Sequence, residues 1–217
     1  MEKDLSENAS AAKGRARLYL LLAAIFRAEP SAGLLEILKS NDVAAVLSGL
    51  GADLTGALDH PGGSGALLEA LAEEYAALFV LPGGVSPYES VRIKGLLCQD
   101  PEWKAREFYQ MCGVTAREDS NTLSDHIGVE LGFMGFIAGK EASAWESGDK
   151  DGALRDRGLQ REFFDGHIGN WVFKFLDDLD KFAFHPFYRE ASRLTRIFLE
   201  IEKEDLNPAK DKPAGIA

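Results

Sequence analysis

The chain has 217 residues, 46% hydrophobic and 27% charged, which is the composition of a globular protein with a buried core. Its formal net charge of -11 argues against nucleic-acid binding, because a phosphate backbone requires a basic surface. An acidic chain instead favours a basic partner, which its electric field attracts at long range. Two cysteines, Cys98 and Cys112, are too few for a zinc tetrad or a disulfide framework, so both are expected to be reduced thiols.

The N-terminal region predicts neither an export signal nor a membrane span. Residues 1–10, MEKDLSENAS, carry charges of both signs and lack an apolar core. The apolar run LYLLLAAIF at residues 18–26 is too short to cross a bilayer and is interpreted as a buried helix. We therefore expect a cytoplasmic protein without direct membrane insertion.

Apolar residues recur at helical spacing along almost the whole chain, whereas strand signals are scarce. Glycine- and proline-rich stretches at residues 51–65 and 81–87 predict loops, and Asp165-Gly166 predicts a break between two helices. The predicted helical segments are residues 10–28, 32–39, 42–50, 66–80, 90–97, 101–112, 123–145, 152–164, 167–182 and a last helix after Pro186. The pattern predicts an all-α fold, a single-domain helical bundle of roughly eight to ten helices. This domain is expected to cover residues 1–204, with a disordered tail at residues 205–217.

The predicted helix at residues 123–145 has an unusual surface. Between residues 125 and 140 it is apolar or small nearly all round, which predicts a position in the middle of the bundle. Four glycines share one stripe and together cost about 4 kcal/mol of helix propensity relative to alanine. Close approach of a neighbouring helix, or a peptide bound in the resulting groove, would offset this cost. The glycines are Gly128, Gly132, Gly135 and Gly139.

The segment LSDHIGVELGFM, residues 123–134, opens this helix with an adjacent aspartate and histidine. One interpretation is structural: Asp125 follows Thr122 at the spacing of a capping box, and an acid suits the first turn of a helix. His126 and Glu130 lie one turn apart and can pair with each other. The other interpretation is a binding or metal site built on the same side chains.

A metal site is the alternative function. Asp125, His126, Glu130 and His167 are ligand types that iron or manganese takes in a helical bundle. The Glu-x-x-His motif that ferritin-like sites take from each of two helices is missing. The sequence also lacks a G-x-S-x-G nucleophile elbow and a phosphate-binding Gly-Lys-Ser/Thr loop, so neither hydrolase chemistry nor nucleotide binding gains support, and no bound cofactor is expected.

Four stretches of the chain, taken in order, resemble the TorD/DmsD/NarJ family of cytoplasmic chaperones for molybdenum-containing redox enzymes. They are LYLLLAAIF; EEYAALFVLPGGVSPYESV at residues 73–91; LSDHIGVELGFM; and FFDGHIGNWVFKF at residues 163–175. Together they run from about residue 15 to about residue 200. The chain departs from the family at Ser124, where family members often have proline; serine can cap the helix that proline would begin.

The resemblance implies an all-helical, non-enzymatic protein that binds the twin-arginine signal peptide, or the apoenzyme, of a molybdoenzyme. Such a chaperone holds its client back from export until the cofactor is inserted. The family's Asp-His pair, implicated in peptide binding, falls on Asp125 and His126. Its Tyr-Glu-Ser segment falls on Tyr88, Glu89 and Ser90. The protein is expected to be a monomer or a homodimer, and the identity of its client enzyme stays open.

The chemistry of such a peptide agrees with the residues. Two guanidinium groups favour carboxylates in bidentate geometry, and Asp125, Glu89 and Glu130 offer them. The histidine beside Asp125 can hydrogen-bond it and fix its rotamer. The apolar stretch that follows the arginines requires a groove between helices. The residues predicted to line that groove are Phe133, Met134 and Phe136.

Overall fold

The computed structural model describes residues 2–115 and 122–207, and every regular element within them is helical. The predicted all-α class is confirmed. The α-helices are α1 (Glu2–Arg27), α2 (Ala32–Lys39), α3 (Asn41–Gly49), α4 (Gly63–Tyr75), α5 (Glu89–Lys94), α6 (Asp100–Met111), α7 (Ile127–Ser147), α8 (Lys150–Phe163), α9 (Gly169–Phe182) and α10 (Pro186–Leu206). Three shorter elements are the 3-10 turn η1 (Gly56–Leu58) and the π-helical turns η2 (Ala76–Val80) and η3 (Phe164–Ile168). Among the described residues, no helix has both the length and the apolar content that a membrane span requires.

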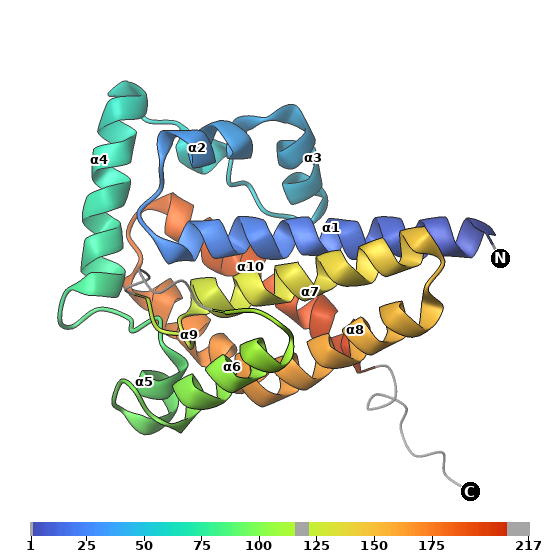
Figure 1. Cartoon of the computed structure of the whole chain (residues 1–217). Coiled ribbons are helices and arrows are strands. Elements are labelled where there is room, and N and C mark those ends of the chain that lie inside the picture. The colour runs from blue at the N-terminus through green and yellow to red at the C-terminus, as the bar shows by residue number, and fades with distance from the viewer. Residues whose placement is uncertain (1, 116–121, 208–217) are drawn as a thin grey trace, which may run out of the picture.

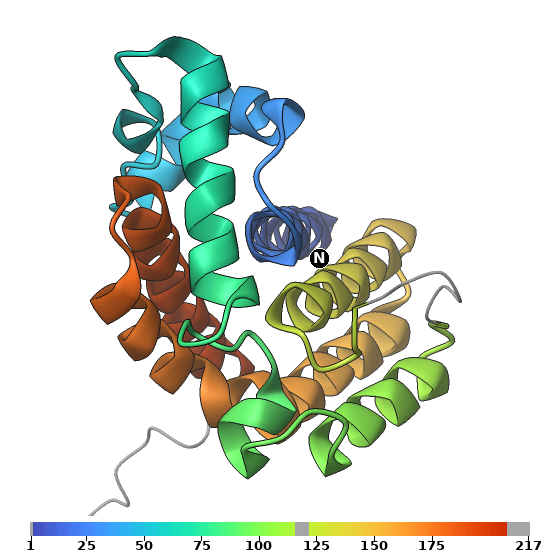
Figure 2. The same ribbon diagram turned by 90° about the vertical axis from the view of Figure 1, so that its left-hand side faces the viewer.

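Helix α1 forms the axis of the molecule. It lies alongside α7, and the two run in opposite directions (Figure 1). A view along α1 shows α7 and α8 on one side of it and α4, α9 and α10 on the other (Figure 2). Helices α5 and α6 lie at the edge of the bundle next to α8 and α9 (Figure 2). Most of the apolar run at residues 18–26 is buried or half-buried by these neighbours, as the sequence predicts, whereas Leu20 is 52% exposed.

The glycine stripe lets α1 and α7 approach closely. A Cβ atom on Gly128 would lie 2.8 Å from Cα of Arg27, and one on Gly135 would lie 2.9 Å from Cγ of Leu20. A Cβ on Gly139, at the far end of the stripe, would meet nothing within 4 Å. The close-helix interpretation is therefore confirmed at Gly128 and Gly135, and does not explain Gly139.

This difference predicts opposite effects of two alanine substitutions. Gly128→Ala is expected to lower the free energy of unfolding by about 2 kcal/mol, because the added methyl group overlaps backbone atoms of Arg27. The cost of this overlap exceeds the gain in helix propensity. Gly139→Ala adds the same atoms in open space and is expected to raise the free energy of unfolding by up to about 1 kcal/mol. Urea denaturation of both variants measures the difference, and equal values for the two would refute a steric role for Gly128.

Several predicted boundaries differ from the structure. Helix α1 begins at Glu2 rather than at residue 10, and α10 continues to Leu206, so residues 205 and 206 belong to the fold. The rest of the predicted tail, residues 208–217, lies outside the described residues. The predicted break at Asp165-Gly166 is wrong, because η3 joins α8 directly to α9. A π-turn adds one residue to a helical turn and so rotates the helix face by roughly 100° without interrupting the chain.

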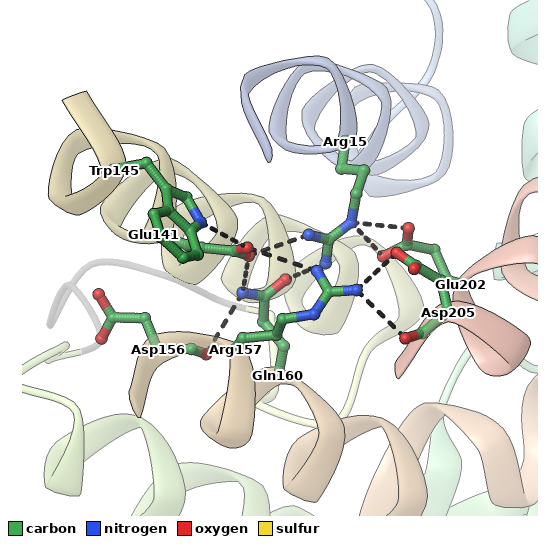
Figure 3. Close-up of polar contacts among 8 residues, drawn as sticks. All are labelled: Arg15, Glu141, Trp145, Asp156, Arg157, Gln160, Glu202 and Asp205. Carbon is green, nitrogen blue, oxygen red and sulfur yellow. Dashed lines mark hydrogen bonds and ion pairs between the residues drawn. The ribbon is translucent and has the colours of Figure 1, made fainter. Parts of the chain in front are cut away.

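A buried polar cluster beneath α1 was not anticipated from the sequence (Figure 3). Arg15 donates from Nε to Oε1 of Glu202 at 2.8 Å and from Nη1 to Oε2 of Glu141 at 2.9 Å. Its third contact is Oε1 of Gln160, whose own amide donates to Glu141 at 2.8 Å. These side chains tie α1, α7, α8 and α10 together, and Glu141 and Glu202 are only 3% and 1% exposed.

Candidate peptide-binding site

Backbone hydrogen bonds join the segment before α5 to the start of α7. The N–H of Glu89 donates to the carbonyl oxygen of Asp125 at 2.9 Å, and the N–H of Ile127 donates to the carbonyl oxygen of Pro87 at 2.9 Å. Between these two bonds, Tyr88 pairs with the residue after Asp125 in an isolated antiparallel bridge. The structure therefore places the predicted Tyr-Glu-Ser segment directly against the Asp-His pair.

Asp125 anchors this junction from within. Its side chain is fully buried, and Oδ2 accepts a hydrogen bond from the N–H of Ser90 at 2.8 Å. Oδ1 has no hydrogen-bond partner among the described residues. Buried polar atoms rarely stay unsatisfied, because each one loses its hydration without compensation. Asp125 is thus a fixed, buried carboxylate with one oxygen still available to a donor.

The predicted capping role of Asp125 is wrong, because its side chain is committed to Ser90. His126 is the N-cap residue of α7, and its Nδ1 accepts a hydrogen bond from the N–H of Gly128 at 3.0 Å. The predicted pairing of His126 with Glu130 is wrong as well, since Oε2 of Glu130 accepts from the indole N–H of Trp171 at 3.1 Å. Because His126 is the N-cap, helix α7 starts at Ile127, four residues later than predicted.

His126 is neutral at pH 7. Burial, followed by the charge of Arg27, lowers its pKa to about 4. Because Nδ1 accepts the bond from Gly128, the ring proton is on Nε2. The His126 ring meets that of Tyr88 edge-on, with centroids 5.0 Å apart. The hydrogen bond recorded for His126 therefore goes to its own helix, and the ring supports Tyr88 rather than Asp125.

Glu89, Glu130 and His167 form a second buried group beside the junction. Nδ1 of His167 and Oε2 of Glu89 are 2.8 Å apart, and the negative charge of Glu89 acts on the carboxyl group of Glu130. The π-turn η3 presents His167 to this group, where its ring stacks on Phe163 with centroids 4.7 Å apart. Each of the three residues has one potential metal-ligand atom, a carboxylate oxygen or an imidazole nitrogen, and these atoms all lie within 4.8 Å of one another.

The predicted four-ligand metal site is wrong. Only two of its members, Glu130 and His167, come together, and the third member of their group is Glu89. Asp125 and His126 are instead held by backbone N–H groups. The hydrogen bonds recorded for the group join His167 to Glu89 and Trp171 to Glu130.

A shallow apolar groove extends from Tyr88 along the turn η2. Its cavity volume is about 300 Å³, and three of its lining residues, Val80, Leu81 and Leu97, have exposed side chains. The pKa of the Tyr88 hydroxyl is raised by burial and then by the charge of Asp125, so the phenol lies within electrostatic reach of the carboxylate. The groove therefore begins next to the buried acid.

The groove predicted from Phe133, Met134 and Phe136 is only partly present. Phe133 and Phe136 line a second groove of about 470 Å³ on α7, whereas Met134 is fully buried in the core. Arg27 also lines this second groove. A cation in the lining opposes an arginine-rich ligand, so the groove at η2 suits a basic peptide better.

The fold and the site together define a class of protein, all-helical with buried carboxylates beside an apolar surface groove. Residues 39–177 match the family model described as nitrate reductase delta subunit. Chaperone protein TorD of Vibrio cholerae serotype O1 is 29% identical over 206 residues, covering 89% of this chain and 92% of that protein. Chaperone protein TorD of Vibrio atlanticus is 28% identical over 211 residues, covering 88% and 94%.

The chain therefore belongs to the nitrate reductase delta subunit family, the TorD/NarJ group that its sequence motifs resemble. A crystal structure from Archaeoglobus fulgidus, described as a redox enzyme maturation protein, is 19% identical with a TM-score of 0.46. It aligns with 86% of this chain and 92% of that one.

Proposed function

We propose that this chain is a cytoplasmic chaperone for a molybdenum-containing oxidoreductase. It binds the twin-arginine signal peptide, or the apo form, of that enzyme and delays export until the cofactor is inserted. Membership of the family supports this proposal, as do the two relatives named chaperone protein TorD. The observation that carries it is the unpartnered Oδ1 of Asp125, a buried acceptor next to an apolar groove.

An arginine of the peptide supplies the donor that Oδ1 lacks. A guanidinium group offers several N–H donors in one plane and forms strong charge-assisted hydrogen bonds with a carboxylate. Ser90 already fixes the orientation of the Asp125 carboxylate through Oδ2, so little side-chain entropy is lost on binding. To reach it, the arginine displaces Tyr88, whose side chain is only half-buried.

The rest of the peptide occupies the groove. Its apolar stretch covers Val80, Leu81 and Leu97, which are 67%, 57% and 48% exposed in the free protein. Covering apolar side chains of this size contributes affinity through the hydrophobic effect. The net charge of -11 accelerates the approach of a basic peptide.

Asp125→Asn tests this proposal with little disturbance of the fold. The amide oxygen still accepts the bond from Ser90, while the charge that attracts guanidinium is removed. Binding of synthetic twin-arginine signal peptides, measured by titration calorimetry, is expected to weaken by about tenfold or more, the value of a charge-assisted hydrogen bond. Circular dichroism is expected to show unchanged helical content.

Two controls separate recognition of arginine from apolar binding. Peptides with both arginines changed to alanine are expected to bind the native protein weakly and to show no further loss with Asp125→Asn. Glu102→Gln removes another buried carboxylate, which pairs with Arg106 on α6, and is expected to leave binding unchanged. Equal affinity for the arginine and alanine peptides would rule out the arginine–carboxylate contact.

A further inference from the structure

The proximity of Glu89 and Glu130 favours a proton on the pair. One carboxyl oxygen of each lies within 4.8 Å of the other, and two ionised carboxylates this close repel each other in a buried site. Glu89 is 2% exposed and Glu130 is fully buried, so water does not separate their charges. Counted as a carboxylate, Glu130 also has one oxygen, Oε1, that lacks a donor among the described residues. A proton on the pair satisfies both observations.

Among the described residues, no lysine or arginine forms a recorded ion pair with Glu89 or Glu130, so neither negative charge is neutralised in this way. The side chain of Asp125 adds a further negative charge near Glu130, and Trp171 of α9 donates one neutral hydrogen bond to it. His167 of η3 contacts Glu89, and it is the only basic side chain in the group. Tyr109 of α6 lies within electrostatic reach of both glutamates, and burial raises the pKa of its hydroxyl well above the usual range.

We propose that Glu89 and Glu130 share one proton at neutral pH, and that this proton fastens the segment Tyr88–Glu89–Ser90 to helix α7. Glu89 is the first residue of α5 and Glu130 lies in the first turn of α7. Their shared proton joins the two helix starts, next to the backbone bonds that Glu89 and Asp125 already make. The segment that covers the Asp125 carboxylate is thereby held closed. This clamp operates in the free protein and does not require that a peptide binds.

The proton is held mainly on Glu130. Burial, followed by the charge of Glu89, raises the pKa of the Glu130 carboxyl well above its usual range. The folded state therefore keeps a proton that the unfolded chain has already lost. Between the pKa of Glu130 in the unfolded chain and its raised pKa in the folded protein, stability falls as pH rises. Deprotonation in the folded state leaves two buried carboxylates facing each other without water. The folding equilibrium constant changes by up to about tenfold for each pH unit within the window.

Glu130→Gln tests the shared proton. The glutamine amide donates to Glu89 without titrating, and its oxygen still accepts from Trp171. Chemical denaturation between about pH 5 and about pH 9 is expected to show the native protein losing stability relative to Glu130→Gln as pH rises. Glu102→Gln, a matched loss of a buried carboxylate outside the group, is expected to keep the native pH dependence. Parallel profiles for the native protein and both variants would overturn the proposal.

Two further measurements address the proton and the clamp directly. Infrared spectroscopy is expected to show the C=O stretch of a buried protonated carboxyl group in the native protein, and to lose that band in Glu130→Gln. Hydrogen exchange at the amides of Glu89 and Ser90 is expected to be faster in Glu130→Ala than in Glu130→Gln. Absence of the infrared band, equal exchange in the two variants, or a stoichiometric divalent metal in the purified native protein would each contradict a shared proton.

These results are independent of the client. Failure of all twin-arginine peptides to bind would remove the proposed function and leave the infrared and denaturation results unaffected. Conversely, a native protein that binds the peptides and lacks the infrared band would keep the function and remove the clamp.

Discussion

Arg15→Ala is expected to lower the free energy of unfolding by about 3 to 5 kcal/mol, the cost of breaking a buried ion pair by removing one partner. The substitution leaves Glu141 and Glu202 buried with less compensation, since each accepts a hydrogen bond from the guanidinium. Arg157, the other cation of the cluster, contacts Glu141 at 3.4 Å and is itself 28% exposed. Urea denaturation measures the loss.

Lys13→Ala is the matched control for this prediction. Lys13 lies on the same helix and pairs with Glu146 at 3.1 Å, with both side chains 53% exposed. A solvent-exposed pair of this kind contributes about 0.5 kcal/mol, because water and salt screen it. If the two alanine variants lose the same stability, the cluster around Arg15 does not hold the four helices together.

His126→Asn is expected to remove about 3 kcal/mol of acid sensitivity from the protein. The pKa of His126 is lowered from 6.5 to about 4, so between these values the unfolded chain binds a proton that the folded protein excludes. The stability of the native protein therefore falls as pH drops from 6.5 towards 4. Asparagine also serves as an N-cap and does not titrate, so the variant keeps the start of α7.

The comparison is made by chemical denaturation across this pH range. The native protein is expected to lose stability relative to His126→Asn as pH falls, because unfolding exposes the imidazole of His126, which then binds a proton. His60→Asn is the matched control, since Nδ1 of His60 also accepts from the N–H two residues on, at Gly62, on a half-buried side chain. If His60→Asn and His126→Asn flatten the pH profile equally, the burial of His126 is not the cause.

Local sequence pattern determined the fold class. Burial of one helix face repeats with the helix period, so the spacing of apolar residues locates α1, α4, α7, α9 and α10. Most of the predicted ends lie within a few residues of the observed ones, and the start of α1 is the exception. Local signals failed where a residue acts outside its own helix. Asp165-Gly166 predicts a break in a helix that instead continues through η3. The capping-box interpretation of Thr122 and Asp125 does not hold, because His126 caps α7.

By itself, the sequence determined that this protein is an acidic helical bundle with an Asp-His pair at the head of a glycine-striped helix, and its motifs placed it in its family. Only the tertiary structure decided which groups that pair and the neighbouring glutamates contact. Asp125 contacts Ser90 across 35 positions, Glu130 contacts Trp171 across 41, and Glu89 contacts His167 across 78. Periodicity reports the environment of one helix, whereas these hydrogen bonds depend on how separate helices pack, so no local pattern specifies them.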